Sequence, residues 1–257
     1  MSSDYQADRP GASLSMENPK RIDIIYLLDS SAVLINWIMI IDLHVHTAIS
    51  ACSKLEISDI LAHAKRFGLD GVCVTDHDVM DIRNHMDEGI QEDGLCVIFG
   101  MEYATPQGDF LIFGPYEEIP TGLEGRDLLN LVRETGGAAV AAHPFRPGRS
   151  ADVRILDNTP DLIVESLNGR NPALADTVAK GLCLVRGFSQ TGGSDAHSLD
   201  ELGRAATRFE ASVKSRNDLI RALLQGLCSP VSPPRQEALN SLNEKTFPFQ
   251  TVFGAGS

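Results

Sequence analysis

From Met39 onward, apolar runs of strand length alternate with amphipathic stretches of helix length, and this alternation most constrains the fold. The apolar runs are nearly continuous, which is typical of strands buried on both faces of a parallel sheet. The sequence therefore predicts an α/β barrel or an open doubly wound sheet. The expected strands are 40–45, 71–75, 95–101, 109–114, 138–142, 162–167, 183–190 and 205–211, and the expected helices are 57–67, 79–90, 124–135, 172–180, 199–203 and 215–226.

The two ends of the chain lack this pattern. Residues 1–38 begin with a polar stretch containing Pro and Gly, which predicts a poorly ordered N-terminal extension, or a start codon upstream of a true start at Met39. The sequence SPVSPP follows Cys228 and breaks the alternation, so we expect a tail at 229–257. The predicted domain therefore spans 39–228.

Composition excludes some classes of partner. The net charge of −13 argues against a general nucleic-acid coat and against a protein that binds anionic membranes. Five scattered Cys without a CxxC pair indicate reduced thiols. The apolar stretch 25–41 is short for a membrane span of about 20 residues and contains polar side chains. No small-residue cleavage site follows it, so we predict a cytoplasmic protein.

Side chains that bind metals recur where the expected strands end. Because the carboxyl ends of parallel strands meet at one edge, these side chains are predicted to converge. In an extended chain, residues i and i+2 project to the same face, so His44 and His46 can share one metal, as can Asp195 and His197. Imidazole combined with carboxylate favours Zn²⁺, Mn²⁺ or Fe²⁺ over Ca²⁺ or Mg²⁺. The converging residues are His44, His46, Asp76, His77, Glu102, His143, Asp195 and His197.

Two other observations narrow the chemistry. His63 and His85 lie inside helical stretches, so we interpret them as surface or packing residues. A Ser/His/Asp hydrolase is disfavoured because the chain has no GxSxG motif.

Four motifs occur in a specific order: DLHVHT (42–47), VTDHD (74–78), AAHP (141–144) and GGSDAH (192–197). With them, the chain from about 41 to 226 resembles the PHP (polymerase and histidinol phosphatase) superfamily. The resemblance implies a distorted (βα)7 TIM-like barrel with the metal site at the C-terminal ends of the strands. It also implies two or three divalent metals and the hydrolysis of phosphoesters.

The resemblance implies a division of the metal ligands. The first site would comprise His44, His46, Asp195 and the bridging Glu102, and the third site His77, His143 and His197. At the second site this sequence departs from the family, because Ala51, Cys52 and Leu111 stand where ligands are common. Either Cys52 or Asp109 would have to join Glu102 there. We therefore expect two firmly bound ions of Mn, Zn or Fe, and a third ion only if one of these residues binds it.

Other residues are assigned to catalysis and substrate binding. The expected catalytic residues are Asp76, Glu102 and His197, with Asp76 either orienting His77 or assisting proton transfer. Arginine binds phosphate oxygens through paired hydrogen bonds, so arginines beside the ligands are candidate phosphate contacts. The expected substrate-binding residues are Arg146, Arg149, Asn168 and Arg170.

The predicted function is a metal-dependent phosphoesterase, of the 5′–3′ exonuclease or nucleotide phosphatase type. Its substrate would be a phosphomonoester or phosphodiester of a nucleotide or short oligonucleotide, because the acidic chain disfavours long duplexes. A histidinol-phosphate or other small-metabolite phosphatase is one alternative. A non-catalytic PHP-like binding or regulatory module is another. The sequence predicts no membrane partner and leaves the oligomeric state open.

Overall fold

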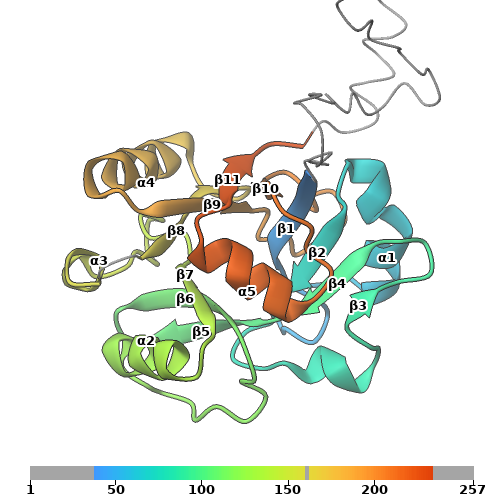
Figure 1. The fold of residues 1–257 in the computed structure, drawn as a ribbon, viewed down its shortest axis with the longest axis horizontal. Coiled ribbons are helices and arrows are strands. Elements are labelled where there is room, and N and C mark those ends of the chain that lie inside the picture. The colour runs from blue at the N-terminus through green and yellow to red at the C-terminus, as the bar shows by residue number, and fades with distance from the viewer. Residues whose placement is uncertain (1–37, 160–161, 234–257) are drawn as a thin grey trace, which may run out of the picture. The chain divides into compact units, whose positions relative to one another are not determined.

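The computed structural model describes residues 38–159 and 162–233 of the chain. Apart from Ile38 and residues 229–233, the expected N-terminal extension and C-terminal tail lie outside the described residues. Strand pairing gives two sheets, both visible in Figure 1. The six-stranded sheet has the order β11-β10-β1-β2-β4-β3, comprising Cys228–Val231, Ala206–Phe209, Met39–Val45, Gly71–Val74, Cys96–Phe99 and Gly89–Ile90. The five-stranded sheet has the order β5-β6-β7-β8-β9, comprising Met101–Thr105, Gly108–Phe113, Ala138–Ala141, Ile163–Asn168 and Ser189–Gly193.

The α/β class is confirmed, but the closed barrel is not. Among the described residues, β1, β2 and β4 pair in parallel, as do β7, β8 and β9, whereas β3, β5, β6, β10 and β11 form antiparallel pairs. The pairing gives two mixed sheets and does not confirm the (βα)7 barrel; the edge strands β9 and β5 of the five-stranded sheet meet the interior strands β1 and β4 of the six-stranded sheet. Next to β9, the Asp195 amide donates to the His44 carbonyl of β1 at 2.7 Å, beside a bridge between Val45 and Ala196. At the other edge of the five-stranded sheet, β4 continues into β5 through Gly100.

The helices follow the predicted positions with local differences. α1 (Ile57–His63) continues as a 3₁₀ turn, η1 (Ala64–Phe67), and Gly68 ends it with φ of 82°. α2 (Gly125–Glu134) and α5 (Arg216–Leu224) also agree. A short 3₁₀ helix, η2 (Asp81–Asn84), and β3 replace the expected helix 79–90, and 199–203 forms turns. α3 (Val153–Asp157) was not predicted.

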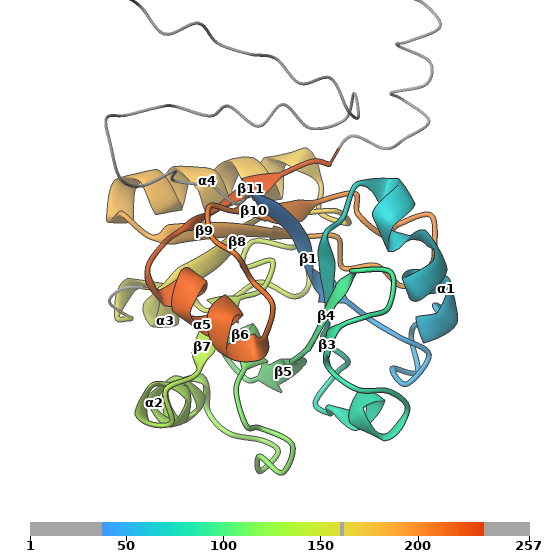
Figure 2. The ribbon, with the colours of Figure 1, turned by 45° about the vertical axis from the view of Figure 1, so that its right-hand side comes forward.

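One strand prediction was wrong. Residues 183–190 were expected to be a strand, but α4 (Ala173–Arg186) continues through the first half of that run. Its buried residues Ala175, Ala179 and Cys183 recur every four positions, so one helical face packs against β8. β9 begins only at Ser189, after Gly187 ends the helix in a left-handed conformation. Figures 1 and 2 show α4 lying over β8 and β9.

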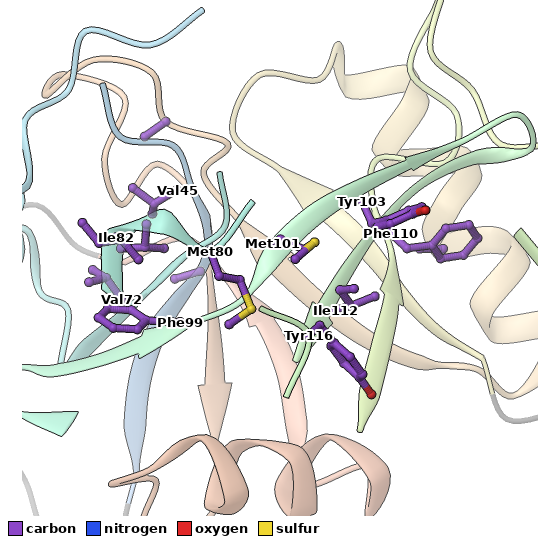
Figure 3. Packing of buried hydrophobic residues seen from close by; sticks show 14 of the residues in the cluster. Val45, Val72, Met80, Ile82, Phe99, Met101, Tyr103, Phe110, Ile112 and Tyr116 are labelled. Carbon is purple, nitrogen blue, oxygen red and sulfur yellow. The ribbon is translucent and has the colours of Figure 1, made fainter. Parts of the chain in front are cut away.

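Both faces of the strands are buried, as the apolar runs predicted. On β6, Phe110 and Ile112 belong to one core cluster, and Leu111 and Phe113 belong to another. Figure 3 shows part of the first cluster, to which β1, β2, β4, β5 and β6 contribute. Leu219 and other residues of α5 cover the second cluster. Within the described residues, no helix is long and apolar enough to span a bilayer.

Phe110→Ala tests the first cluster. Phe110 has no exposed surface, so its removal leaves a cavity, and we expect the free energy of unfolding to fall by about 3–5 kcal/mol. Urea denaturation followed by circular dichroism measures this loss. Leu184→Ala is the control, because Leu184 is 78% exposed and should change the unfolding free energy by no more than about 0.5 kcal/mol. Equal losses in the two variants would contradict the described core.

Candidate metal centre

Four side-chain atoms from three strand ends form a compact cage. The Nε2 atoms of His44 and His46 lie 3.0 Å apart. Glu102 Oε2 lies 3.4 Å from the former and 3.2 Å from the latter, and Asp195 Oδ1 lies 3.6 and 3.4 Å from them. A tetrahedral ion with ligands at about 2.0–2.1 Å has ligands about 3.4 Å apart. These five separations therefore match the edges of one tetrahedral metal site.

Glu102 joins this cage to other histidines. Its Oε2 also lies 3.0 Å from His77 Nδ1, while its Oε1 lies 2.8 Å from His143 Nε2. The carboxylate is buried near the start of β5, where Glu102 forms a bridge with His77. Its two oxygens therefore contact different histidines, as those of a carboxylate that bridges two ions would.

The remaining histidines group differently from the expected third site. Potential ligand atoms of His46, His77 and His197 lie within 4.8 Å of one another, and the ring centroids of His77 and His197 each lie 4.4 Å from that of His46. His143 instead groups with His44 and Asp195, and separately with Glu102 and Asp109. The geometry thus favours Asp109 over Cys52, an exposed residue in none of these groups, as the further candidate ligand.

The nitrogen of each HxH ring that faces away from the cage also has a partner. His44 Nδ1 lies 3.0 Å from Glu165 Oε1, and His46 Nδ1 lies 3.5 Å from Ser50 Oγ. Ser50 donates to Asp76 Oδ1 at 2.5 Å, and the Thr47 amide and hydroxyl donate to the same carboxylate. Asp76 therefore organises the loop after the HxH pair, and its hydrogen bonds run to this loop.

Backbone strain is concentrated at the same strand ends. Among the described residues, three non-glycine residues have positive φ: Asp78 (55°), His143 (30°) and Asp195 (55°). Such conformations cost about 1–3 kcal/mol each and persist where surrounding contacts hold them. Asp78 N donates to the Glu102 carbonyl, and Asp195 N donates to the His44 carbonyl. The strained backbone of the candidate ligand Asp195 and that of Asp78 are therefore both held by hydrogen bonds to candidate ligands.

The electrostatics show a centre with excess negative charge. Burial acts to lower the pKa of His44, but Asp195, Glu165 and Glu102 together raise it well above its ordinary value. Burial raises the pKa of Glu102, yet the surrounding imidazoles, His44 foremost, hold it well below its usual range. For His197, burial and the neighbouring His46 lower the pKa, which favours the neutral ring that a metal needs.

The residues present fit divalent metal ions. Imidazole and carboxylate are the donors that Zn²⁺, Mn²⁺ and Fe²⁺ accept. In the part of the chain that the structure describes, His143 Nδ1 is one of two buried side-chain atoms without a hydrogen-bond partner, the other being Ser166 Oγ. Buried polar atoms without partners are rare, and a bound ion is one explanation.

The expected substrate residues separate into two pairs. Arg146 Nη2 lies 2.6 Å from Asp195 Oδ2 and donates to Asn168 Oδ1, so both Arg146 and Asn168 already have partners in the protein. Asn168 is also 3% exposed. Arg149 and Arg170 are more open: their side chains are 46% and 39% exposed, with ion pairs to Asp109 and Glu201 respectively. The structure thus brings all four to the centre but leaves Arg149 and Arg170 more accessible.

Sequence reasoning missed three polar residues that support the ligands. Asp42 is fully buried and accepts from the amides of His44, Ser194 and Gly203, and burial raises its pKa to about 6. Glu165 and Ser50 make the ring contacts described above. Asp42 and Glu165 were detectable as lone acids within apolar strands, whereas Ser50 gave no comparable signal.

Comparison with known proteins yields two family models. The PHP domain model matches residues 42–142 and the PHP-associated model matches 177–228. Two uncharacterised proteins of Methanocaldococcus jannaschii are similar. One is 32% identical over 116 residues (41% of this chain, 68% of that protein), and the other 30% over 192 residues (70% and 75%).

Solved structures share the fold. PsfC from Pseudomonas syringae superposes with a TM-score of 0.63 at 23% identity, covering 81% of this chain and 97% of PsfC. The lesion-specific endonuclease PfuEndoQ from Pyrococcus furiosus gives 0.54 at 18% identity, covering 74% and 56%.

Glu102→Gln tests the bridging position. An amide cannot supply the negative charge between two cations, so we expect the metal content after dialysis to fall by at least about half. Elemental analysis of purified protein measures this. Glu210→Gln, which removes a 52%-exposed carboxylate on the surface, should retain the wild-type metal content. Equal metal content in both variants would remove Glu102 from the ligand set.

Proposed function

Since this chain belongs to the PHP family and is a metal-dependent hydrolase, we propose that it hydrolyses a phosphomonoester or phosphodiester of a nucleotide or short oligonucleotide. One observation carries the proposal. The nitrogen and carboxylate atoms of His44, His46, Glu102 and Asp195 converge at tetrahedral spacing beside accessible arginines. Metal ligands next to guanidinium groups suit an anionic phosphate.

The chain would hold divalent metals, of which we propose Mn²⁺, Zn²⁺ or Fe²⁺, through the grouped residues. These ions supply Lewis acidity, which neutralises phosphate oxygens and lowers the pKa of a water. Glu102 joins the groups, and His143 and Asp109 extend them on one side, with His77 and His197 on the other. The proposed holding residues are His44, His46, His77, Glu102, Asp109, His143, Asp195 and His197.

Arg170 and Arg149 are the proposed phosphate contacts. Arg170 Nη1 lies 2.9 Å from His197 Nδ1, so its guanidinium reaches the ligand cluster while remaining partly exposed. Arg149 reaches it from the other side through Asp109. Arg146 is assigned instead to holding Asp195, because its Nη2 lies against the Asp195 oxygen that faces away from the cage.

His197 is proposed to hold a metal ion beside the leaving group, because its Nδ1 already faces Arg170 and the Asp195 carbonyl. Its side chain is 12% exposed, whereas those of His44 and His143 are almost fully buried, so a departing alkoxide can reach it. Burial and the neighbouring His46 lower its pKa, which favours the neutral ring that a metal ion needs. Asp76 shapes the loop carrying Ser50 and has no proposed contact with substrate.

The acidic chain supports a small substrate. The net charge of −13 disfavours binding to long duplexes, which a basic surface would favour. A lesion-specific endonuclease shares the fold, which supports a nucleic-acid phosphoester as the substrate. Because that protein is only 18% identical, a small-metabolite phosphoester is the main alternative substrate. A panel of nucleotides, short 5′-phosphorylated oligonucleotides and sugar phosphates, read by phosphate release, would distinguish them.

Metal removal tests the reaction class. Purified protein with added Mn²⁺ should hydrolyse a generic aryl phosphate, and EDTA should abolish this activity, because Lewis acidity supplies most of the charge stabilisation. Restoring Mn²⁺ should restore turnover. Full activity in chelated protein would contradict the mechanism, and metal binding without turnover on any phosphoester would indicate a binding module.

Arg170→Ala tests the phosphate contact. Loss of a charge-assisted hydrogen bond should weaken transition-state binding about 10- to 100-fold in kcat/KM, without changing the metal content. Arg146→Ala is the matched comparison, because it should lower both metal retention and kcat through Asp195. Steady-state kinetics and elemental analysis of both variants provide the measurement. If Arg170→Ala lowers metal retention and Arg146→Ala lowers only kcat/KM, then Arg146 contacts the phosphate and Arg170 supports the metal ligands.

A further inference from the structure

Glu165 on β8 belongs to none of the ligand groups, yet its buried carboxylate contacts two of their members. It is fully buried, and its two oxygens contact three other residues. Oε1 lies 3.0 Å from His44 Nδ1. Oε2 accepts from the His143 amide at 2.8 Å and from Asn168 Nδ2 at 2.9 Å. One carboxylate thus contacts one ligand through its side chain and a second through its backbone.

We propose that Glu165 is the positioning residue of the metal centre, fixing the ring of His44 and the backbone of His143. The inference rests on the metal site proposed above but not on the reaction that the site performs. Glu165 itself would contact neither metal nor substrate.

The contact with His44 sets its tautomer. A neutral imidazole has one protonated and one free nitrogen, and an ionised carboxylate can only accept hydrogen bonds. In the neutral, metal-binding form of His44, Glu165 would therefore hold the proton on Nδ1 and leave the lone pair on Nε2. Nε2 is the atom that faces His46, Glu102 and Asp195 in the cage. A carboxylate behind a ligand ring also makes that ring a stronger donor.

The contact with His143 supports a strained backbone. His143 has a φ of 30°, which a side chain with a Cβ rarely adopts. The hydrogen bond from its amide to Glu165 Oε2 ties this conformation to the adjacent strand. Because the same carboxylate holds His44, the two ligands are fixed relative to each other, and their ring centroids lie 5.6 Å apart.

Neighbouring residues pack closely around the Glu165 carboxylate. A Cβ at Gly193 would collide with His44 Cβ and would lie 2.6 Å from Glu165 Oε1, so this glycine makes room for the contact. On the other side, Asn168 fills the space between Glu165 and Arg146.

Glu165→Gln tests the proposal with a change of one atom. An amide has one acceptor, so its NH₂ group must face either the His44 ring proton or the donors at His143 and Asn168. We expect the dissociation constant for Zn²⁺, measured by competition with a chromophoric chelator, to rise by about 10- to 100-fold. Asp176→Asn is the matched control. Asp176 is 8% exposed and accepts from Asn168 N and Asn171 Nδ2, but contacts no proposed ligand.

A spectroscopic measurement separates positioning from general stability. In the zinc-loaded wild type, the ring proton on His44 Nδ1 should be protected from exchange in ¹⁵N-resolved NMR spectra. Glu165→Gln should lose this protection and Asp176→Asn should keep it. This signal is available in the wild type even if Glu165→Gln fails to fold, and a wild-type His44 without a protected Nδ1 proton would overturn the proposal.

The outcomes also separate this inference from the proposed function. If the wild type binds Zn²⁺ and Glu165→Gln binds it within about twofold, the positioning role is wrong and the metal site stands. If the wild type binds no metal, both fail. Loss of affinity confined to Glu165→Gln supports the positioning role, whatever phosphoester the enzyme hydrolyses.

Discussion

The contact of one buried carboxylate, Glu102, with four imidazole rings is the interaction on which the site depends. Charged groups are costly to bury unless opposite charge or hydrogen bonds compensate them. Glu102 and Asp195 compensate the histidines, and the histidines hold the pKa of both carboxylates below its usual range. The same balance leaves a negative potential that divalent cations suit. The electrostatics and the ligand geometry therefore both favour a divalent cation.

The two sheets together supply the charged residues of the site. His44 and His46 end a strand of one sheet, while His143 and Asp195 follow strands of the other. The centre lies where the sheets meet, at the hydrogen bond from Asp195 to His44. Metal binding would therefore link the two sheets. Loss of the metal should lower the stability of the fold as well as the activity.

Three buried carboxylates fix the positions of the candidate ligands where the two sheets meet. The carboxylates of Glu165, Asp42 and Asp76 form hydrogen bonds with backbone amides, hydroxyls and a ring nitrogen. These bonds restrict the orientations of the ligand rings and the conformations of the strained strand ends. Strain of this kind is typical of functional sites, because it persists only where surrounding contacts determine it.

The sequence by itself determined the α/β class, the strand ends and the residue types that gather there. HxH spacing and parallel-strand geometry are local rules, so the convergence of His44, His46 and Asp195 could be predicted without coordinates. Only tertiary structure decided that the sheets do not close, because antiparallel pairing depends on partners far apart in sequence. It also decided which atoms share a site, the partners of Arg146, and the role of Glu165. These depend on side-chain directions across a sheet junction, which no pattern along a single chain specifies.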